Sequence, residues 1–329
     1  MGNCYTSNKD GSSYDMISEF KKDNQTVIFS KVNWKKCTSK SQIEKHAPKN
    51  KNVVSITAVG ESKMATLKPP CVPIPPFDWT SLNTTFNEFL VLGPYQYENE
   101  SIYFGQYKEG MRNGKGRQIW VDGSYFEGLW KDDMTNGFGR LVHASQEVYE
   151  GNWLNDHANG FGKYFHSSGA VYEGNWKNDM QDGYGVETWA DGVKYAGNYL
   201  DGNKHGQGTF YWGSNDVYKG NFANNVIDGY GEYFWNDGRI YKGSWSNNRI
   251  NGKGQFFWVN GNYFSGTYLD DKKEGPGIFR WADGRELHAV WKNGKASTPA
   301  IMISNDGRET EVDPSHIEEE IDDANDEDN

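Results

Sequence analysis

The stretch Tyr172-Glu-Gly-Asn-Trp176, followed by Gly183-Tyr-Gly185 and then by Gly192, decides the fold because it recurs along the chain. Units of this kind begin at residues 103, 126, 149, 172, 195, 218, 241 and 264, always 23 residues apart. A fixed period of this length indicates a repeat architecture. The repeat is defined by paired glycines, namely Gly114, Gly116, Gly137, Gly139, Gly160, Gly162, Gly183, Gly185, Gly206, Gly208, Gly229, Gly231, Gly252, Gly254, Gly275 and Gly277.

Each unit is predicted to be a β-hairpin. Tyr103, Gly105 and Tyr107 alternate at period two, as the residues of one strand face do. The polar residue before each Gly-x-Gly pair, for example Asn113, predicts one turn at that point. Asp-Gly pairs such as Asp122-Gly123 predict the second turn. The fold class is therefore all-β, an antiparallel sheet of tandem 23-residue hairpins.

Aromatic residues recur on the face that carries the glycines. A ring can lie across a glycine backbone and partly replace a second layer of structure. The tryptophans of these columns form a candidate binding or stacking face: Trp120, Trp130, Trp153, Trp176, Trp189, Trp212, Trp235, Trp245, Trp258 and Trp281. Two apolar strips, one containing Ile119 and Val142 and one containing Tyr125 and Val148, mark the opposite face. Either sheet curvature hides these strips, or the N-terminal segment, a second copy or a partner covers them.

The pattern Tyr-x-Gly-x-Trp, then Gly-x-Gly, then a further glycine, resembles the MORN (membrane occupation and recognition nexus) repeat. The resemblance covers residues 93–294 with eight copies in register, followed by a degenerate ninth. It implies an elongated, single-layered antiparallel sheet. It also implies a scaffold at a membrane, in a cilium or in the cytoskeleton, and it is compatible with a homodimer formed through the C-terminal repeats.

The N-terminus matches a lipidation signal. Met1-Gly2-Asn3-Cys4-Tyr5-Thr6 fits the motif for N-myristoylation of Gly2. One myristoyl chain binds a membrane only marginally, so a second signal is needed, and Cys4 is a candidate for palmitate. A second candidate is a basic segment that would attract anionic phospholipid. Its lysines are Lys31, Lys35, Lys36, Lys40, Lys45, Lys49 and Lys51.

Charge and composition divide the chain further. The formal net charge is −11, yet residues 1–68 carry twelve lysines against six acids, and residues 309–329 carry eleven acids and no lysine or arginine. We predict a basic, largely irregular leader at 1–66, a proline-rich connector and cover at 67–92 and a capping half-repeat at 93–102. The repeat array follows at 103–294, and a disordered acidic tail at 295–329.

The sequence offers no recognisable catalytic chemistry. The Gly-x-Gly pairs lack the Lys-Ser/Thr of a phosphate-binding loop, and no kinase signature or nucleophile-and-base set is present. His143 and His166 occupy one column, but replacement of a stacking tryptophan explains them better than a metal pair. Three scattered cysteines make no metal site or disulfide framework. We therefore expect no enzyme activity, no cofactor, no metal and no nucleic-acid partner.

These observations favour a non-enzymatic scaffold on the cytoplasmic face of a membrane, peripheral and lipid-anchored. It would dock other proteins or lipid headgroups. Two alternatives stay open. One is an axonemal or cytoskeletal component of the radial-spoke-head kind, in which lipid plays no part. The other is a regulatory partner of a phosphoinositide kinase.

Overall fold

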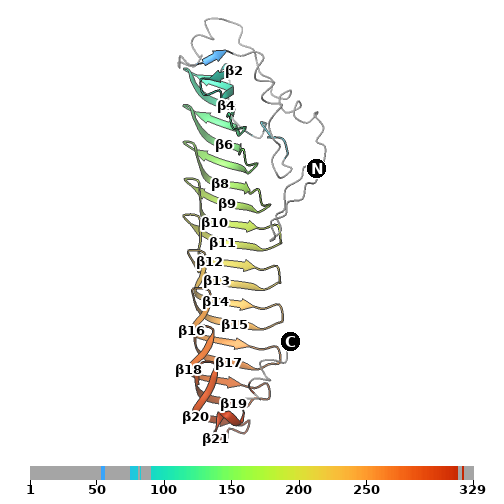
Figure 1. Cartoon of the computed structure of the whole chain (residues 1–329), viewed down its shortest axis with the longest axis vertical. Helices are drawn as coiled ribbons and strands as arrows, with labels where there is room; N and C mark the ends of the chain where they lie inside the picture. The colour runs from blue at the N-terminus through green and yellow to red at the C-terminus, as the bar shows by residue number, and fades with distance from the viewer. Residues whose placement is uncertain (1–52, 56–74, 81, 83–89, 318–320, 322–329) are drawn as a thin grey trace. The chain divides into compact units, whose positions relative to one another are not determined.

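The computed structural model describes residues 53–55, 75–80, 82, 90–317 and 321. The predicted all-β fold is confirmed, since the described strands form one open antiparallel sheet. The chain divides into two compact units, the first ending at Ala190 and the second starting at Asp191, except that Tyr184–Val186 group with the second. Within each unit, successive strands run side by side (Figure 1).

The strands alternate between seven and nine residues through the repeats. The first unit contains β1 (Val53–Ser55), β2 (Leu90–Tyr97), β3 (Ile102–Lys108), β4 (Met111–Ile119), β5 (Tyr125–Lys131), β6 (Met134–Val142), β7 (Val148–Leu154), β8 (His157–Phe165) and β9 (Val171–Lys177). β10 (Met180–Thr188) contributes residues to both units. The second unit contains β11 (Lys194–Leu200), β12 (Asn203–Tyr211), β13 (Val217–Ala223), β14 (Val226–Phe234), β15 (Ile240–Ser246), β16 (Arg249–Phe257), β17 (Tyr263–Leu269), β18 (Lys272–Arg280), β19 (Glu286–Lys292), β20 (Lys295–Ile303), β21 (Glu309–Val312) and the 3₁₀ turn η1 (Pro314–His316).

The turn predicted just before each Gly-x-Gly pair is misplaced. Asn113 lies inside β4, and the chain reverses earlier, at the two residues between β3 and β4. In most repeats both turn residues have positive φ, for example Asn155 at 50° and Asp156 at 67°. A two-residue turn with two positive φ values matches the twist of the flanking strands. The Asp-Asp, Asn-Asp and Asn-Asn pairs were therefore the true turn signal.

The two glycines of each pair serve different purposes, as Gly206 and Gly208 show. Gly206 has a φ of +69°, in the left-handed region, at the point where the register of the β11–β12 hairpin shifts. Gly208 pairs with Gly197, and the Tyr195 ring lies across both. A Cβ on Gly208 would stand 2.5 Å from that ring. The first glycine thus permits a bulge, and the second leaves room for a ring.

Neighbouring repeats are joined through the rings. The Tyr149 ring meets Trp153 of its own repeat edge to face at 5.1 Å, and Trp176 of the next repeat at 5.2 Å. The Trp176 indole N–H also donates to the carbonyl of Gly162, at 3.2 Å. Edge-to-face aromatic pairs stabilise by about 1 kcal/mol beyond the area they bury. Every repeat therefore depends on its neighbours for its core.

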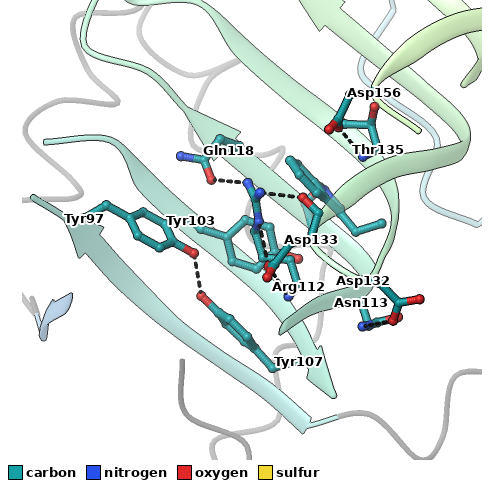
Figure 2. A network of polar contacts seen from close by, with 12 residues as sticks. Tyr97, Tyr103, Tyr107, Arg112, Asn113, Gln118, Asp132, Asp133, Thr135 and Asp156 are labelled. Atoms are coloured by element: carbon teal, nitrogen blue, oxygen red, sulfur yellow. Dashed lines mark hydrogen bonds and ion pairs between the residues drawn. The ribbon is translucent and has the colours of Figure 1, made fainter. Parts of the chain in front are cut away.

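The turns form a second link between repeats (Figure 2). The Asp133 carboxylate accepts from the backbone N–H of Arg112 at 2.7 Å, and Asp156 accepts from that of Thr135 at 2.7 Å. The same bond, from a turn side chain to a backbone N–H 21 residues earlier, is made by Asp179, Asn225, Asn248 and Asp271. The Arg112 guanidinium additionally lies 4.1 Å from the Trp130 ring. Turn chemistry thus holds consecutive hairpins in register.

The sheet continues beyond the predicted end of the array. Residues 295–329 were expected to form a disordered acidic tail, but β20 and β21 occupy the first part of that range. Here an alanine pair, Ala289 and Ala300, replaces the usual glycine pair. Leu287 stands where other repeats have a ring, and both it and Ala300 are fully buried. A smaller side chain above the pair leaves space for two methyl groups, so the ninth repeat keeps the hairpin without the glycine pair.

The ring-over-glycine contact predicts a large effect of one added methyl group. Gly208→Ala should lower the free energy of unfolding by about 2 kcal/mol or more, because the Tyr195 ring and the backbone of its partner strand must both move. Gly213→Ala is the matched control, since its Cβ would meet only the Asp191 carbonyl at 3.7 Å. Chemical unfolding of both variants measures the difference. Equal stability of the two would contradict the packing role of the glycine.

The buried tyrosines predict a loss of stability in alkali. Burial raises the pKa of Tyr195 above its ordinary 10, and it does the same for Tyr103, Tyr149, Tyr172, Tyr218 and Tyr241. The folded chain then keeps phenol protons that the unfolded chain releases, so this stability is complete below about pH 10 and is lost above it.

Tyr195→Phe is the matched variant for this prediction, because Phe126 and Phe264 already occupy the same column. It removes one titrating group and keeps the ring. We expect its free energy of unfolding to fall less steeply than that of the unaltered protein between about pH 9 and about pH 11. Identical slopes would show that Tyr195 is not the source of the effect.

Candidate functional site

The face opposite the rings, here called the ladder face, carries a row of paired charges in the first unit. Arg117, Glu127, Arg140 and Glu150 stand opposite one another across β4 to β7. Glu127 is 3.6 Å from both Arg117 and Arg140, and the Arg140 Nε donates to Glu150 at 2.5 Å. The row continues with Lys163 and Glu173, which are 3.2 Å apart. Its strands thus alternate basic and acidic residues.

One end of this row is buried. Arg117, Glu127 and Arg140 are between 2% and 5% exposed, whereas the side chains of Lys163 and Glu173 are about half exposed. Burial raises the pKa of the Glu127 carboxyl, against the opposing effect of the two guanidinium groups. Charges are rarely buried in a single-layered sheet unless something covers them.

A segment of the N-terminal region provides this cover. Residues 75–80, here called the strap, lie on the ladder face. The Arg140 Nη1 donates to the Pro75 carbonyl at 2.9 Å, and the Lys115 Nζ donates to the Trp79 carbonyl at 2.7 Å. Partial burial lowers the pKa of Lys115, opposed by nearby Asp78. Residues 75–80 fall within 67–92, the range for which a connecting and covering role was predicted.

An aromatic stack fixes the strap to the sheet. The Phe77 ring is stacked on Phe138 of β6, with centroids 6.1 Å apart and planes 18° apart, and Trp79 packs against its edge at 5.0 Å. The Arg140 guanidinium lies 5.4 Å from the Phe77 centroid. Phe77 is only 5% exposed. The ladder face therefore receives a segment that is neither strand nor helix and turns at Trp79–Thr80, through one ring-on-ring contact and two cation-to-carbonyl hydrogen bonds.

The second unit carries a ladder face with the opposite charge order. Lys219, Glu232 and Lys242 stand opposite one another across β13 to β15, with Lys242 3.5 Å from Glu232. Tyr230, in the Gly-x-Gly column that Phe138 occupies in the first unit, is 57% exposed. A shallow hollow of about 650 Å³ lies on one side of Tyr230, and another of about 610 Å³ lies on the other.

The floor of these hollows is backbone. Gly197, Gly208 and Gly220 line the first, and Gly243, Gly254 and Gly266 line the second. The middle residues of the Gly-x-Gly pairs, which include Lys115, Phe138 and Tyr230, did not emerge as candidates from the sequence. In that column, aromatic residues such as Phe138 and Tyr230 occur among polar residues such as Lys115 and Gln207. A comparison of this position across the repeats would have revealed them.

The predicted tryptophans fall into two groups. Trp130, Trp153, Trp245, Trp258 and Trp281 are buried and belong to the packing of the ring face. Trp120, Trp176, Trp189, Trp212 and Trp235 are partly exposed. The apolar strips are buried in the first unit, where Ile119, Val142 and Val148 are at most 3% exposed, whereas Tyr211 of the second unit is 38% exposed.

The predicted lipidation and lipid-contact residues, Gly2, Cys4 and Lys31 to Lys51, lie outside the described residues. Within the described part of the chain, no group of three His, Cys, Asp or Glu side chains is placed to hold a metal ion. His166 instead pairs with Glu147, at 3.1 Å. In the same part of the chain, no helix has the length and apolar character needed to cross a membrane.

The geometry defines a class, a tandem β-hairpin repeat protein with one packed face and one contact face. The MORN repeat family matches eight times, at residues 103–125, 126–148, 149–171, 172–194, 195–217, 218–238, 241–263 and 264–284. Because these matches cover more than half of the chain, it belongs to the MORN repeat family. That family is a non-catalytic repeat scaffold whose repeats mediate protein or lipid interactions.

No curated protein matches the chain. Similar solved structures include the wild-type TCP10 domain of Danio rerio CPAP, at a TM-score of 0.36 and 13% identity, covering 60% of this chain and 93% of that one. Another is the virginiamycin B lyase from Staphylococcus aureus, at a TM-score of 0.14 and 14% identity, covering 66% of this chain and 68% of that one. At such TM-scores neither structure bears on the function of this chain.

The stacked strap predicts a local effect of one truncation. Phe77→Ala removes the ring that packs on Phe138, at a cost of about 3 kcal/mol. We expect the strap to leave the sheet, so that hydrogen exchange quickens at residues 75–80 and in β4 to β6. Val121→Ala, at a side chain that is 63% exposed, is the control. Unchanged exchange in Phe77→Ala would mean that other contacts hold the strap.

Proposed function

We propose that this chain is a non-enzymatic MORN-repeat scaffold, held at the cytoplasmic face of a membrane by acylation of Gly2 and Cys4, whose repeats dock protein partners. One structural observation carries the docking part. The ladder face of the first unit already binds a segment of chain that is neither strand nor helix, through Phe138, Arg140 and Lys115. A face that binds the strap in this way has the chemistry to bind a partner segment.

The anchoring part of the proposal is supported by the N-terminal sequence. Gly2 and Cys4 together supply two acyl chains, which is the number that stable membrane attachment needs. The seven lysines between Lys31 and Lys51 would add about 1 kcal/mol each near an anionic surface. The family's role in protein or lipid interactions is compatible with such a position.

Removal of the acylation site tests the anchoring. Gly2→Ala should abolish the mass increase of one myristoyl group and move most of the protein from the membrane pellet to the supernatant. Cys4→Ser keeps the myristate and should give intermediate, more easily reversed pelleting, because a single chain binds only marginally. Intact mass and fractionation measure both effects.

The control is the Phe77→Ala variant, which alters the strap and leaves the N-terminal motif intact. It should pellet as the unaltered protein does. An unmodified N-terminus, or a native protein that stays in the supernatant, would end the membrane proposal. Recovery of the protein in a detergent-resistant cytoskeletal fraction would then favour the axonemal alternative.

A further inference from the structure

The strap shows what kind of ligand a ladder face of this chain accepts. It is a proline-rich segment with a phenylalanine ring on a Gly-x-Gly aromatic, backbone carbonyls on cationic side chains, and an acidic residue, Asp78, beside Lys115. Prolines suit such a segment because they hold it extended and reduce the entropy lost on binding. The first unit has its own strap in place.

The second unit presents an exposed aromatic residue, Tyr230, among polar side chains, although Glu232 stands where Arg140 binds the strap in the first unit. Tyr230 lies four repeats after Phe138, in the same column. It is 57% exposed, whereas Phe138 lies under Phe77. Gln207, which replaces Lys115, lines the first hollow; its Nε2 donates to Asn221 at 2.5 Å and has a second N–H for a ligand. Hollows on both sides leave room for an extended chain to cross Tyr230 along the sheet.

The charge on this face favours an acidic ligand. Lys219 and Glu232 line the first hollow, and Lys242 and Lys253 line the second. The two hollows are thus lined by three cations and one carboxylate, so the face around Tyr230 carries an excess of positive charge. The row beneath the strap is more nearly balanced, since Arg117 and Arg140 alternate with Glu127 and Glu150. Charge complementarity therefore calls for at least one acidic side chain on the ligand.

We propose that the ladder face of the second unit, centred on Tyr230, is the docking site for an extended, acidic, proline- and aromatic-containing segment of a partner protein. The ring contact repeats that of the strap, whereas the cationic donors lie at other positions, because Glu232 replaces Arg140. Its ring packs on Tyr230, its carbonyls accept from Gln207 and Lys219, and its carboxylate faces Lys242 and Lys253. The partner supplies this segment because the strap of this chain is already bound. This inference rests on the protein-docking part of the proposed function.

The strap's own sequence provides the probe. A fluorescent peptide with residues 73–82, Pro-Ile-Pro-Pro-Phe-Asp-Trp-Thr-Ser-Leu, is titrated with the full chain and followed by anisotropy. We expect saturable binding that weakens about tenfold or more in Tyr230→Ala, because a central aromatic contact dominates peptide affinity. Binding should also weaken in Lys242→Gln and at high salt. A peptide with the phenylalanine replaced by alanine should not bind.

Two controls make the result decisive. Val259→Ala removes an exposed side chain of the second unit that lines neither hollow, and it should bind the peptide normally. Phe138→Ala reports whether the peptide has instead displaced the strap from the first unit. Binding lost in Phe138→Ala but kept in Tyr230→Ala, or no saturable binding at all, overturns the inference. Membrane anchoring is measured separately through Gly2→Ala, so the two proposals fail independently.

Discussion

The contact on which the rest of the structure depends is an aromatic ring lying flat over a pair of glycines on adjacent strands. A single-layered sheet has no second layer to bury its side chains against, so its core must be made within one face. Tyr195 does this by covering Gly197 and Gly208, where any Cβ would collide with it. The ring is fully buried although it belongs to a sheet one layer thick. Burial of such a ring stabilises by about 2–3 kcal/mol.

This arrangement makes the repeats interdependent and also explains how they end. Within each unit, a ring is flanked by an aromatic residue of its own repeat and one of the next, as Tyr149 is by Trp153 and Trp176 and Tyr218 is by Phe222 and Trp245. A terminal repeat lacks one neighbour, so its packing rule can relax. The last hairpin does so with Leu287 over an Ala289–Ala300 pair. The ring and the glycine pair therefore vary together. Where a smaller side chain such as Leu287 replaces the ring, alanine can replace the two glycines that it covers.

Much of the fold followed from the sequence because the constraint repeats without an insertion. The 23-residue period fixed the hairpins, and the glycine columns fixed the ring face. The turn position was wrong because the bulge glycine, such as Gly206, and the polar residue before it look like a turn when only local chemistry is considered. Cover of the opposite face by the N-terminal segment was one of the predicted alternatives, but the residues that make the contact were missed for the converse reason. Arg140 and Phe138 acquire their roles only when residue 77, some sixty positions earlier, packs on them.

The two faces consequently carry different kinds of information. On the ring face nearly every position is constrained by packing, and substitutions there change stability. On the ladder face the backbone geometry is set by the glycines, so the side chains can vary from repeat to repeat without loss of the hairpin. The charge order does vary, since Glu127 and Arg140 of the first unit become Lys219 and Glu232 four repeats later. A repeat sheet in which the side chains of one face can vary in this way can present different binding surfaces along its length. A scaffold requires such surfaces.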